Sequence, residues 1–420
     1  MEKIIVRGGK KLQGEVDISV AKNAVLPIIV ATILNPTEII LKKVPMLEDV
    51  TVLINLLREL NCEVQFSSIT GDLKINTQNL KEVDPNSELI RKMRASFLIM
   101  GPMLARFGKC KISMPGGCNI GSRPVDLHLK GFNALGIESE VGYGYVEAKI
   151  DKLHGNRIYL DFPSVGATEN IMMAAVLAPG VTVIENAAEE PEIWDLARFL
   201  NCMGANIEGA GYGKITIHGV SELKQPEPFT PIFDRIEAGT FMVAAGITNS
   251  KITINGVNEE HLMPTIEKLK ECGVYCTIDG QKMIVDGTKE KRPVDIKTMP
   301  YPGFPTDMQA QMMALLAITK GVSVITETVF ENRFMHVGEL GRMGANIKID
   351  GRIAIVEGVT TLTGCGVKAT DLRAGAAMIL AGLVANGQTE IGEIYHIDRG
   401  YTNIEEKFRK LGAEIYRVHK

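Results

Sequence analysis

Six short runs rich in Ala, Met and Leu recur along the chain, and each has an Ala near its start. Successive Ala residues are 71, 72, 71, 72 and 64 positions apart, at Ala24, Ala95, Ala167, Ala238, Ala310 and Ala374. The runs are apolar on nearly all faces, which is typical of helices buried on every side. A turn and a β-type segment follow each run, as where Gly180 precedes residues 181–184. The pattern predicts six buried helices, each followed by a strand.

A second feature repeats with a similar period: an apolar residue at a helix end, then usually Gly, then the start of a strand. The intervals are 75, 68, 69, 71 and 68 positions, between Leu60, Leu135, Met203, Cys272, Met343 and Leu411. Gly follows in five cases and Asn61 in the first; either residue tolerates the left-handed backbone that ends a helix. The two markers predict six α+β modules of about 70 residues, each with a buried helix, an amphipathic helix and several strands.

The Pro-dense segment 225–231 divides these modules into three before it and three after it. This division predicts two similar lobes with a cleft between them. A solenoid of six modules is the alternative, and the repeat length disfavours it because solenoid repeats are usually shorter.

Composition excludes several classes of protein. The chain has 420 residues, 45% of them hydrophobic and 23% charged, with a formal net charge of −4. This balance disfavours nucleic-acid binding. There is no signal-peptide core, and the longest apolar stretches are about half the length that spans a bilayer. The seven cysteines show no spacing typical of a disulfide framework or a zinc site. We expect a cytoplasmic protein without a membrane span or a metal.

The residues just before each repeated Ala differ between modules, so candidate chemistry lies there. Backbone N–H groups and the helix dipole favour an anion at a helix start. Three of these starts add a cation, namely Lys22, Arg94 and Arg373. If the lobes face each other, these groups would form a site for a small, multiply charged anion. The alternative is that each cation pairs with a carboxylate at the surface.

Two further residues are candidates for chemistry. Asp307 lies at another helix start, where it either caps the helix or accepts a proton from a bound hydroxyl group; the spacing leaves both open. Cys118 lies in the Gly- and Pro-rich segment 114–124, which predicts an accessible loop. Its neighbours Lys111 and Arg123 favour a reactive thiolate. A single loop cysteine is a weak signal on its own.

Together these segments closely resemble the UDP-N-acetylglucosamine 1-carboxyvinyltransferases, a family of enolpyruvyl transferases. The resemblance runs from Lys3 nearly to the C-terminus and rests on residues 21–24, 93–96, 115–128, 164–168, 304–311, 328–334, 371–374 and 395–400. It implies an α/β fold of two lobes, an inside-out α/β barrel with three repeated units per lobe in pseudo-threefold symmetry. In the family the first strand belongs to the second lobe. We therefore expect one lobe of residues 22–230 and another of residues 1–21 with 231–420.

The resemblance also implies a reaction. The enolpyruvyl group of phosphoenolpyruvate would pass to the 3-hydroxyl of UDP-N-acetylglucosamine with release of phosphate, through a tetrahedral addition intermediate. This is the first committed step of bacterial peptidoglycan synthesis, and so serves the cell wall, cell shape and cell division. The implied partners are these two small-molecule substrates, and no metal or organic cofactor is required.

Roles of individual residues follow from the same resemblance. Cys118 matches the general acid, which can carry a covalent phosphoenolpyruvate adduct and is the target of the epoxide fosfomycin. Asp307 matches the acceptor of the hydroxyl proton, and Lys22 and Arg399 are expected to join in catalysis. The expected phosphoenolpyruvate ligands are Lys22, Asn23, Arg123, Arg373 and Arg399. The expected sugar-nucleotide contacts are Arg94, Arg123, Pro124, Val125, Asp126, Leu127, Ser164, Val165, Gly166, Asp307 and Val329.

One position departs from the family, and two other functions remain as alternatives. Phe162 stands where the family often has Lys, so we expect a different affinity for the sugar nucleotide. Transfer to shikimate 3-phosphate is disfavoured because the cysteine loop, residues 116–123, is absent from that sister family. A non-catalytic paralogue that binds nucleotide-sugars and regulates a partner is disfavoured because Cys118 and Asp307 are both present.

Overall fold

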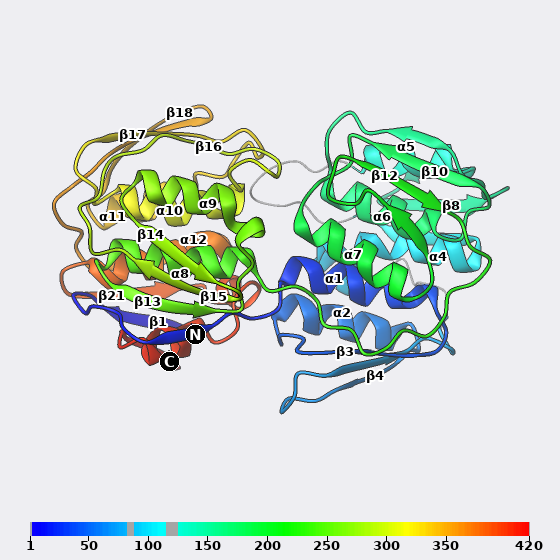
Figure 1. Cartoon of the computed structure of the whole chain (residues 1–420), viewed down its shortest axis with the longest axis horizontal. Coiled ribbons are helices and arrows are strands. Elements are labelled where there is room, and N and C mark those ends of the chain that lie inside the picture. Colours follow the sequence, from blue (N-terminus) through cyan, green and yellow to red (C-terminus); the bar gives the residue numbers. More distant parts are fainter. Residues whose placement is uncertain (1, 82–87, 115–124, 420) are drawn as a thin grey trace. The chain divides into compact units, whose positions relative to one another are not determined.

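A computed structural model describes residues 2–81, 88–114 and 125–419 of the chain. The described residues divide into two compact units (Figure 1). Unit 1 comprises residues 2–19 and 233–419, and unit 2 comprises residues 20–81, 88–114 and 125–232. The chain thus crosses between units at residues 19–20 and 232–233, each two positions from the boundary expected from the sequence.

Unit 2 contains three sheets among its described residues. Their strands are β3 (Glu38–Leu41), β4 (Glu63–Phe66), β5 (Leu73–Asn76), β6 (Lys109–Ser113), β7 (Ile137–Gly142), β8 (Tyr145–Ile150), β9 (Arg157–Tyr159), β10 (Val181–Glu185), β11 (Asn206–Glu208) and β12 (Lys214–His218). The strand orders are β3-β5-β4, β6-β8-β7 and β11-β12-β10-β9. All neighbours are antiparallel except β9 and β10, which pair in parallel.

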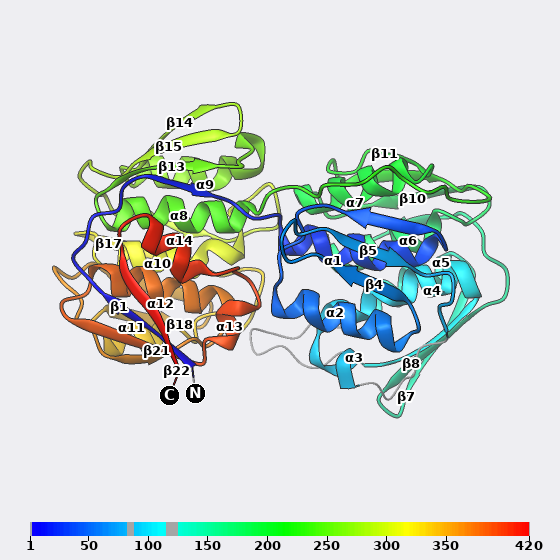
Figure 2. The ribbon, with the colours of Figure 1, turned by 90° about the horizontal axis from the view of Figure 1, so that it is seen from below.

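Unit 1 also contains three sheets. Their strands are β1 (Glu2–Arg7), β2 (Glu15–Asp17), β13 (Lys251–Asn255), β14 (Tyr275–Asp279), β15 (Lys282–Asp286), β16 (Ile296–Lys297), β17 (Val322–Thr326), β18 (Asn346–Asp350), β19 (Ile353–Glu357), β20 (Gly366–Lys368), β21 (Gln388–Gly392) and β22 (Glu414–His419). The orders are β20-β21-β1-β22, β14-β15-β13-β2 and β16-β17-β19-β18. The N-terminal β1 pairs with the C-terminal β22 (Figure 2), so the first strand belongs to unit 1.

The sheets of each unit surround buried helices. In unit 2 these are α1 (Lys22–Ala31) with η1 (Thr32–Leu34), η2 (Arg94–Ile99) leading into α4 (Met100–Phe107), and α6 (Val165–Ala175). In unit 1 they are α8 (Arg235–Ile247), η3 (Thr306–Met308) leading into α10 (Gln309–Leu316), and α12 (Leu372–Val384). The remaining helices are α2 (Glu48–Glu59), α3 (Glu88–Lys92), α5 (Asp126–Ala134), α7 (Pro191–Cys202), α9 (Glu259–Glu271), α11 (Val337–Arg342), α13 (Tyr395–Asp398) and α14 (Ile404–Lys410).

Both sequence markers correspond to these elements. The six repeated Ala residues lie in α1, η2, α6, α8, α10 and α12. The second marker is in every case the residue that ends a helix: α2, α5, α7, α9, α11 and α14. The residue after it has a positive φ, from 64° at Asn61 to 96° at Gly344. The prediction of six modules with buried helices is therefore confirmed.

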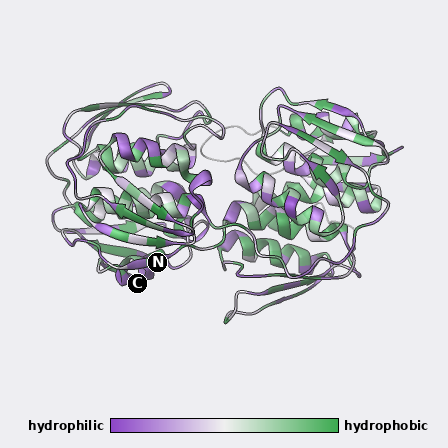
Figure 3. Cartoon of the chain, in the orientation of Figure 1, coloured by the Kyte–Doolittle hydropathy of each residue, from purple (hydrophilic) through white to green (hydrophobic). Residues whose placement is uncertain are grey.

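Burial follows from the apolar runs. Apolar side chains concentrate on the inner helices and on alternate strand positions (Figure 3), and they form one hydrophobic core in each unit. Among the residues that the structure describes, no helix combines the length and the apolar character needed to cross a bilayer.

Candidate active site

Asp307 lies in a charged cluster in unit 1. Its Oδ1 accepts a hydrogen bond from Arg333 Nη2 at 2.7 Å, and its Oδ2 accepts one from Arg373 Nε at 3.1 Å. The two arginine side chains are only 5% and 2% exposed. Neither η3 nor α10 has a side-chain cap, so Asp307 is bound to arginines rather than capping its helix. Of the two interpretations left open by the sequence, capping is wrong.

The electrostatics of this cluster determine the charge of Asp307. Burial alone would raise the pKa of Asp307, but Arg333 and Arg373 outweigh it and hold the pKa well below its usual range. The carboxylate is therefore ionised at neutral pH, as a proton acceptor must be. The same arginines weaken its affinity for a proton, so acceptance becomes easier once an anion shares their charge.

The start of α12, which carries Arg373, packs against the short helix α13, which Arg399 follows. Asp371 accepts hydrogen bonds from the backbone N–H of Arg373 at 2.8 Å and of Ala374 at 2.9 Å. The short helix α13 packs tightly on this end, because a side chain at Gly400 would collide with Leu372. Arg399 directly follows α13 and is half-buried. Two predicted ligands of the anion therefore come from adjoining elements.

Glu327 joins the segments that carry Asp307 and Val329. It is buried at the end of β17. Its Oε1 accepts from the backbone N–H of Val329 at 2.9 Å, and its Oε2 accepts from Thr306 Oγ1 at 2.9 Å. Because both segments bind one carboxylate, Val329 and Asp307 are held in a fixed relation.

Neither Arg333 nor Glu327 was among the predicted site residues. Arg333 lies within segment 328–334, one of the segments that carry the family resemblance, and that was its only signal. Glu327 precedes that segment and carried none. Their importance arises from pairing with residues 26 and 21 positions away, respectively.

Lys22 and Asn23 open α1 in unit 2. Lys22 Nζ lies 2.6 Å from Asp49 Oδ2, and the two side chains are only 9% and 6% exposed. The pair joins the start of α1 to the start of α2. Lys22 does have a carboxylate partner, but the pair is buried rather than at the surface. Asn23 is exposed.

The segments 125–127 and 164–166 approach each other in unit 2. They open α5 and α6, respectively. A Cβ atom added to Gly166 would lie 3.4 Å from Cε1 of His128, in the first turn of α5. Val125 is buried, Leu127 and residues 164–166 are half-buried, and Asp126 is exposed. The structure therefore brings these two predicted sugar-nucleotide segments together around His128.

Side-chain caps occupy some of the N–H groups expected to favour an anion at three of the six buried helix starts. Ser164, Asp234 and Asp371 accept hydrogen bonds from the first turns of α6, α8 and α12. These are the side chains that most often cap helices. The starts of α1, η2 and η3 with α10 have no side-chain cap.

Several predicted residues lie outside the described part of the chain. These are Cys118, Arg123 and Pro124; Arg94 opens η2, but its side chain is also outside it. Their predicted roles therefore stay predictions. Phe162, the departure from the family, is 45% exposed.

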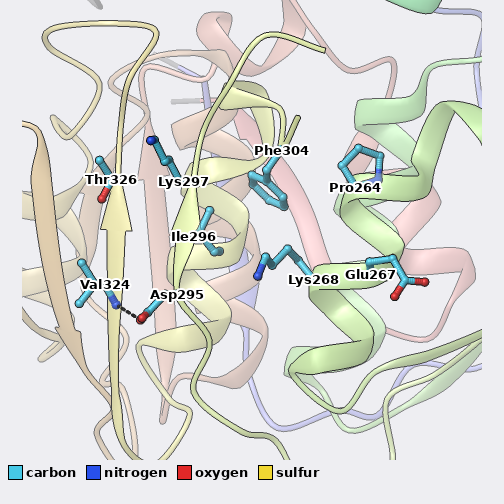
Figure 4. A pocket seen from close by; sticks show the side chains of 9 residues that line it. All are labelled: Pro264, Glu267, Lys268, Asp295, Ile296, Lys297, Phe304, Val324 and Thr326. Atoms are coloured by element: carbon cyan, nitrogen blue, oxygen red, sulfur yellow. Dashed lines mark hydrogen bonds between the residues drawn. The ribbon is translucent and has the colours of Figure 1, made fainter. Parts of the chain in front are cut away.

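A cavity of about 470 Å³ lies elsewhere in unit 1, between α9 and strands β16 and β17 (Figure 4). Apolar side chains and two cations and two anions line it: Pro264, Ile296, Phe304, Val324, Lys268, Lys297, Glu267 and Asp295, with Thr326. The carboxylate of Asp295 already has a protein partner, since it accepts a hydrogen bond from the Val324 N–H at 2.8 Å. The lining includes none of the predicted site residues, and its balanced charges select no ionic ligand.

Comparison with known proteins agrees with this description. Residues 6–408 match the family model described as EPSP synthase (3-phosphoshikimate 1-carboxyvinyltransferase). UDP-N-acetylglucosamine 1-carboxyvinyltransferase 2 of Clostridium tetani is 65% identical over 418 residues, covering 100% of both chains. UDP-N-acetylglucosamine 1-carboxyvinyltransferase 1 of Clostridium acetobutylicum is 63% identical and also covers 100% of both chains.

Solved structures share the fold. The enolpyruvyl transferase NikO from Streptomyces tendae superimposes with a TM-score of 0.88 at 24% identity, over 99% of each chain. EPSP synthase from Acinetobacter baumannii gives a TM-score of 0.76 at 18% identity, over 100% of each chain. At these identities the likeness concerns the fold alone, and it confirms the predicted fold class.

Proposed function

The chain belongs to the EPSP synthase family of enolpyruvyl transferases, and from that premise we propose that it transfers the enolpyruvyl group of phosphoenolpyruvate to the 3-hydroxyl of UDP-N-acetylglucosamine. The observation that carries the proposal is the full-length identity of 65% to a UDP-N-acetylglucosamine 1-carboxyvinyltransferase. The cluster of Asp307, Arg333 and Arg373 supports it, because it joins a carboxylate base to cations suited to an anionic substrate.

The reaction proceeds by addition and then elimination. Cys118 donates a proton to the methylene carbon of phosphoenolpyruvate, and the neighbouring carbon becomes electron-poor. The sugar hydroxyl attacks that carbon while Asp307 takes the hydroxyl proton. In the elimination the Cys118 thiolate takes back a methyl proton and phosphate departs, which leaves the enolpyruvyl ether of the sugar nucleotide. Cys118 is also the thiol that fosfomycin would alkylate.

We assign the phosphoenolpyruvate anion to the cations Lys22, Arg123, Arg373 and Arg399 and to the amide of Asn23. Arg373 also lowers the pKa of Asp307. Arg373 Nη1 is buried and has no hydrogen-bond partner within the part of the chain that the structure describes. A carboxylate or phosphate oxygen would supply that partner. Once the anion shares the charge of Arg373, the proton affinity of Asp307 rises, so binding of one substrate prepares the base for the other.

The sugar nucleotide is assigned to helix starts in unit 2 together with Val329 and Asp307. Besides residues 125–127 and 164–166, we include Arg94, Arg123 and Pro124 from the family resemblance. The half-buried turns around Gly166 provide directional hydrogen-bonding groups rather than net charge. The reaction would supply peptidoglycan precursors in the bacterial cytoplasm. Transfer to shikimate 3-phosphate and a purely regulatory role are not favoured, because the most similar relatives reported above are named for the sugar nucleotide.

The choice of acceptor tests this function. Purified protein is incubated with phosphoenolpyruvate and either UDP-N-acetylglucosamine or shikimate 3-phosphate, and released phosphate and product mass are measured. We expect phosphate and an enolpyruvyl ether with the sugar nucleotide only. Turnover with shikimate 3-phosphate alone would support the sister activity, and no turnover with either acceptor would overturn the enzymatic assignment.

A further inference from the structure

A single buried tyrosine contacts the three inner helices of unit 1. The Tyr401 hydroxyl lies 2.9 Å from Thr240 Oγ1 on α8 and 3.3 Å from Gln311 Nε2 on α10. Its ring centroid lies 5.2 Å from the guanidinium carbon of Arg373 on α12, within the range of a cation–π interaction. Each contact comes from the N-terminal half of its helix, and each helix belongs to a different module. Tyr401 therefore joins the three modules at one point.

The donors and acceptors in this network can be assigned. The Thr240 hydroxyl donates its one proton to the carbonyl oxygen of Ile236 at 2.8 Å, so Tyr401 must be the donor in its contact with Thr240. Gln311 Nε2 donates to both Tyr401, at 3.3 Å, and Thr240, at 3.2 Å. The Tyr401 hydroxyl therefore donates to Thr240 and accepts from Gln311.

The network fixes the guanidinium of Arg373, one of the proposed anion ligands. Asp307 binds Arg373 at Nε, and the Tyr401 ring lies within cation–π range of the same guanidinium. Nη1 remains buried without a partner among the described residues. Fixed by these two contacts, the guanidinium keeps this donor available.

We propose that Tyr401 is a positioning residue that orients Arg373 toward the phosphoenolpyruvate anion. The inference rests on the proposed function for the identity of that anion. Its consequence is selective: loss of the hydroxyl should weaken binding of phosphoenolpyruvate and leave the sugar nucleotide unaffected. A merely structural role would lower the melting temperature without separating the two substrates.

The test uses Tyr401→Phe, which keeps the ring and removes only the hydroxyl. We expect KM for phosphoenolpyruvate to rise about tenfold, as for the loss of one hydrogen bond to a charged group. KM for UDP-N-acetylglucosamine should stay within about twofold of the wild-type value, because the substitution removes no proposed contact to the sugar nucleotide. Equilibrium binding of phosphoenolpyruvate, measured by calorimetry, should weaken by the same factor.

Two threonines on α8 distinguish a positioning role of the network from a general effect on packing. Thr240 and Thr248 are both buried and both donate to the carbonyl four residues earlier. Only Thr240 contacts Tyr401, so Thr240→Val should reproduce the shift in KM for phosphoenolpyruvate and Thr248→Val should not.

Two outcomes would overturn the inference: unchanged phosphoenolpyruvate binding in a folded Tyr401→Phe or Thr240→Val, or the same shift in Thr248→Val. If the wild type transfers nothing to either acceptor, the proposed function fails instead. The binding comparison by calorimetry then still decides whether Tyr401 orients Arg373.

Discussion

The starts of η3 and α12 in unit 1 and the start of α6 in unit 2 occupy equivalent places in repeated modules, but the side chains around them differ in charge. Around the starts of η3 and α12, Asp307, Arg333 and Arg373 form a buried cluster of full charges. Around the starts of α5 and α6, the central groups are the imidazole of His128 and the amide of Asn170. The apolar runs that build the modules are alike. The two sites therefore differ in the side chains around these helix starts rather than in the apolar runs.

The neutral network of unit 2 is as directional as the charged one. Asn170 Oδ1 accepts from the backbone N–H of Gly101 at 2.7 Å, so its Nδ2 is the donor to Phe97 O and to His128 Nδ1, each at 3.1 Å. A neutral His128 then carries its proton on Nε2, the side nearer Gly166. Such donors suit a large polar ligand, whereas the arginines of unit 1 suit a compact anion.

The largest effect should come from breaking the charged cluster at its centre. Asp307→Asn keeps the size of the side chain but removes the proton acceptor, and we expect kcat to fall about 10²- to 10⁴-fold. Phosphate release measures the loss. Asp350→Asn, at an exposed position in β18, is the control and should keep full activity. Turnover of Asp307→Asn close to wild type would mean that another group accepts the proton.

Acid should weaken unit 1 through His336, which is buried and interacts electrostatically with Asp371 and Arg333. Burial lowers the pKa of His336 to about 4, with Asp371 opposing and Arg333 adding to the effect. In the unfolded chain the histidine has a pKa near 6.5, so between pH 6.5 and 4 it is protonated there but neutral in the folded chain. The stability that depends on a neutral His336 is therefore present above about pH 6.5 and is lost as pH falls toward 4.

His336→Gln tests that pH dependence. Urea unfolding of both proteins at pH 7 and pH 5 should show wild type losing about 2 kcal/mol more than the variant on acidification. Parallel losses in the two proteins would exclude His336 as the cause.

In unit 2 the corresponding effect should have the opposite sign. Burial in α6, with repulsion from Glu192 and Glu190, raises the pKa of Glu169 well above its usual range. The folded chain keeps a proton that the unfolded chain releases, so this stability is present at low pH and is lost as pH rises. Glu169→Gln removes that penalty. Its free energy of unfolding should exceed that of wild type most at the highest pH, and a constant difference across pH would contradict this.

The smallest effect should come from restoring the family's lysine. The Phe162 side chain is half exposed, and the hydrogen bond at this position joins its carbonyl oxygen to the Ser164 N–H at 2.7 Å. Phe162→Lys keeps that bond and adds a cation, so KM for UDP-N-acetylglucosamine should fall about threefold, as for an exposed ion pair. Phe162→Gln is the uncharged control, and equal constants for both variants would argue against a charge contact.

The sequence predicted the architecture well because its signals are local. The apolar runs and the residues Leu60 through Leu411 that end helices recur at one period, and each marks an element directly. The site was predicted only in part. Lys22, Arg373 and Asp307 follow from their positions at helix starts, but the two-arginine environment of Asp307 depends on pairing across 26 and 66 positions. No sequence pattern predicted a role for Tyr401, because its contacts form only when three helices pack together.

The start of α12 is proposed to bind the phosphoenolpyruvate anion, and the start of α6 is proposed to bind the sugar nucleotide. Measuring both KM values in Arg373→Lys and in Gly166→Ala tests this division. We expect Arg373→Lys to raise only KM for phosphoenolpyruvate and Gly166→Ala to raise only KM for UDP-N-acetylglucosamine, each about tenfold. If both variants raise the same constant, or each raises both, the proposed division between the two helix starts is wrong.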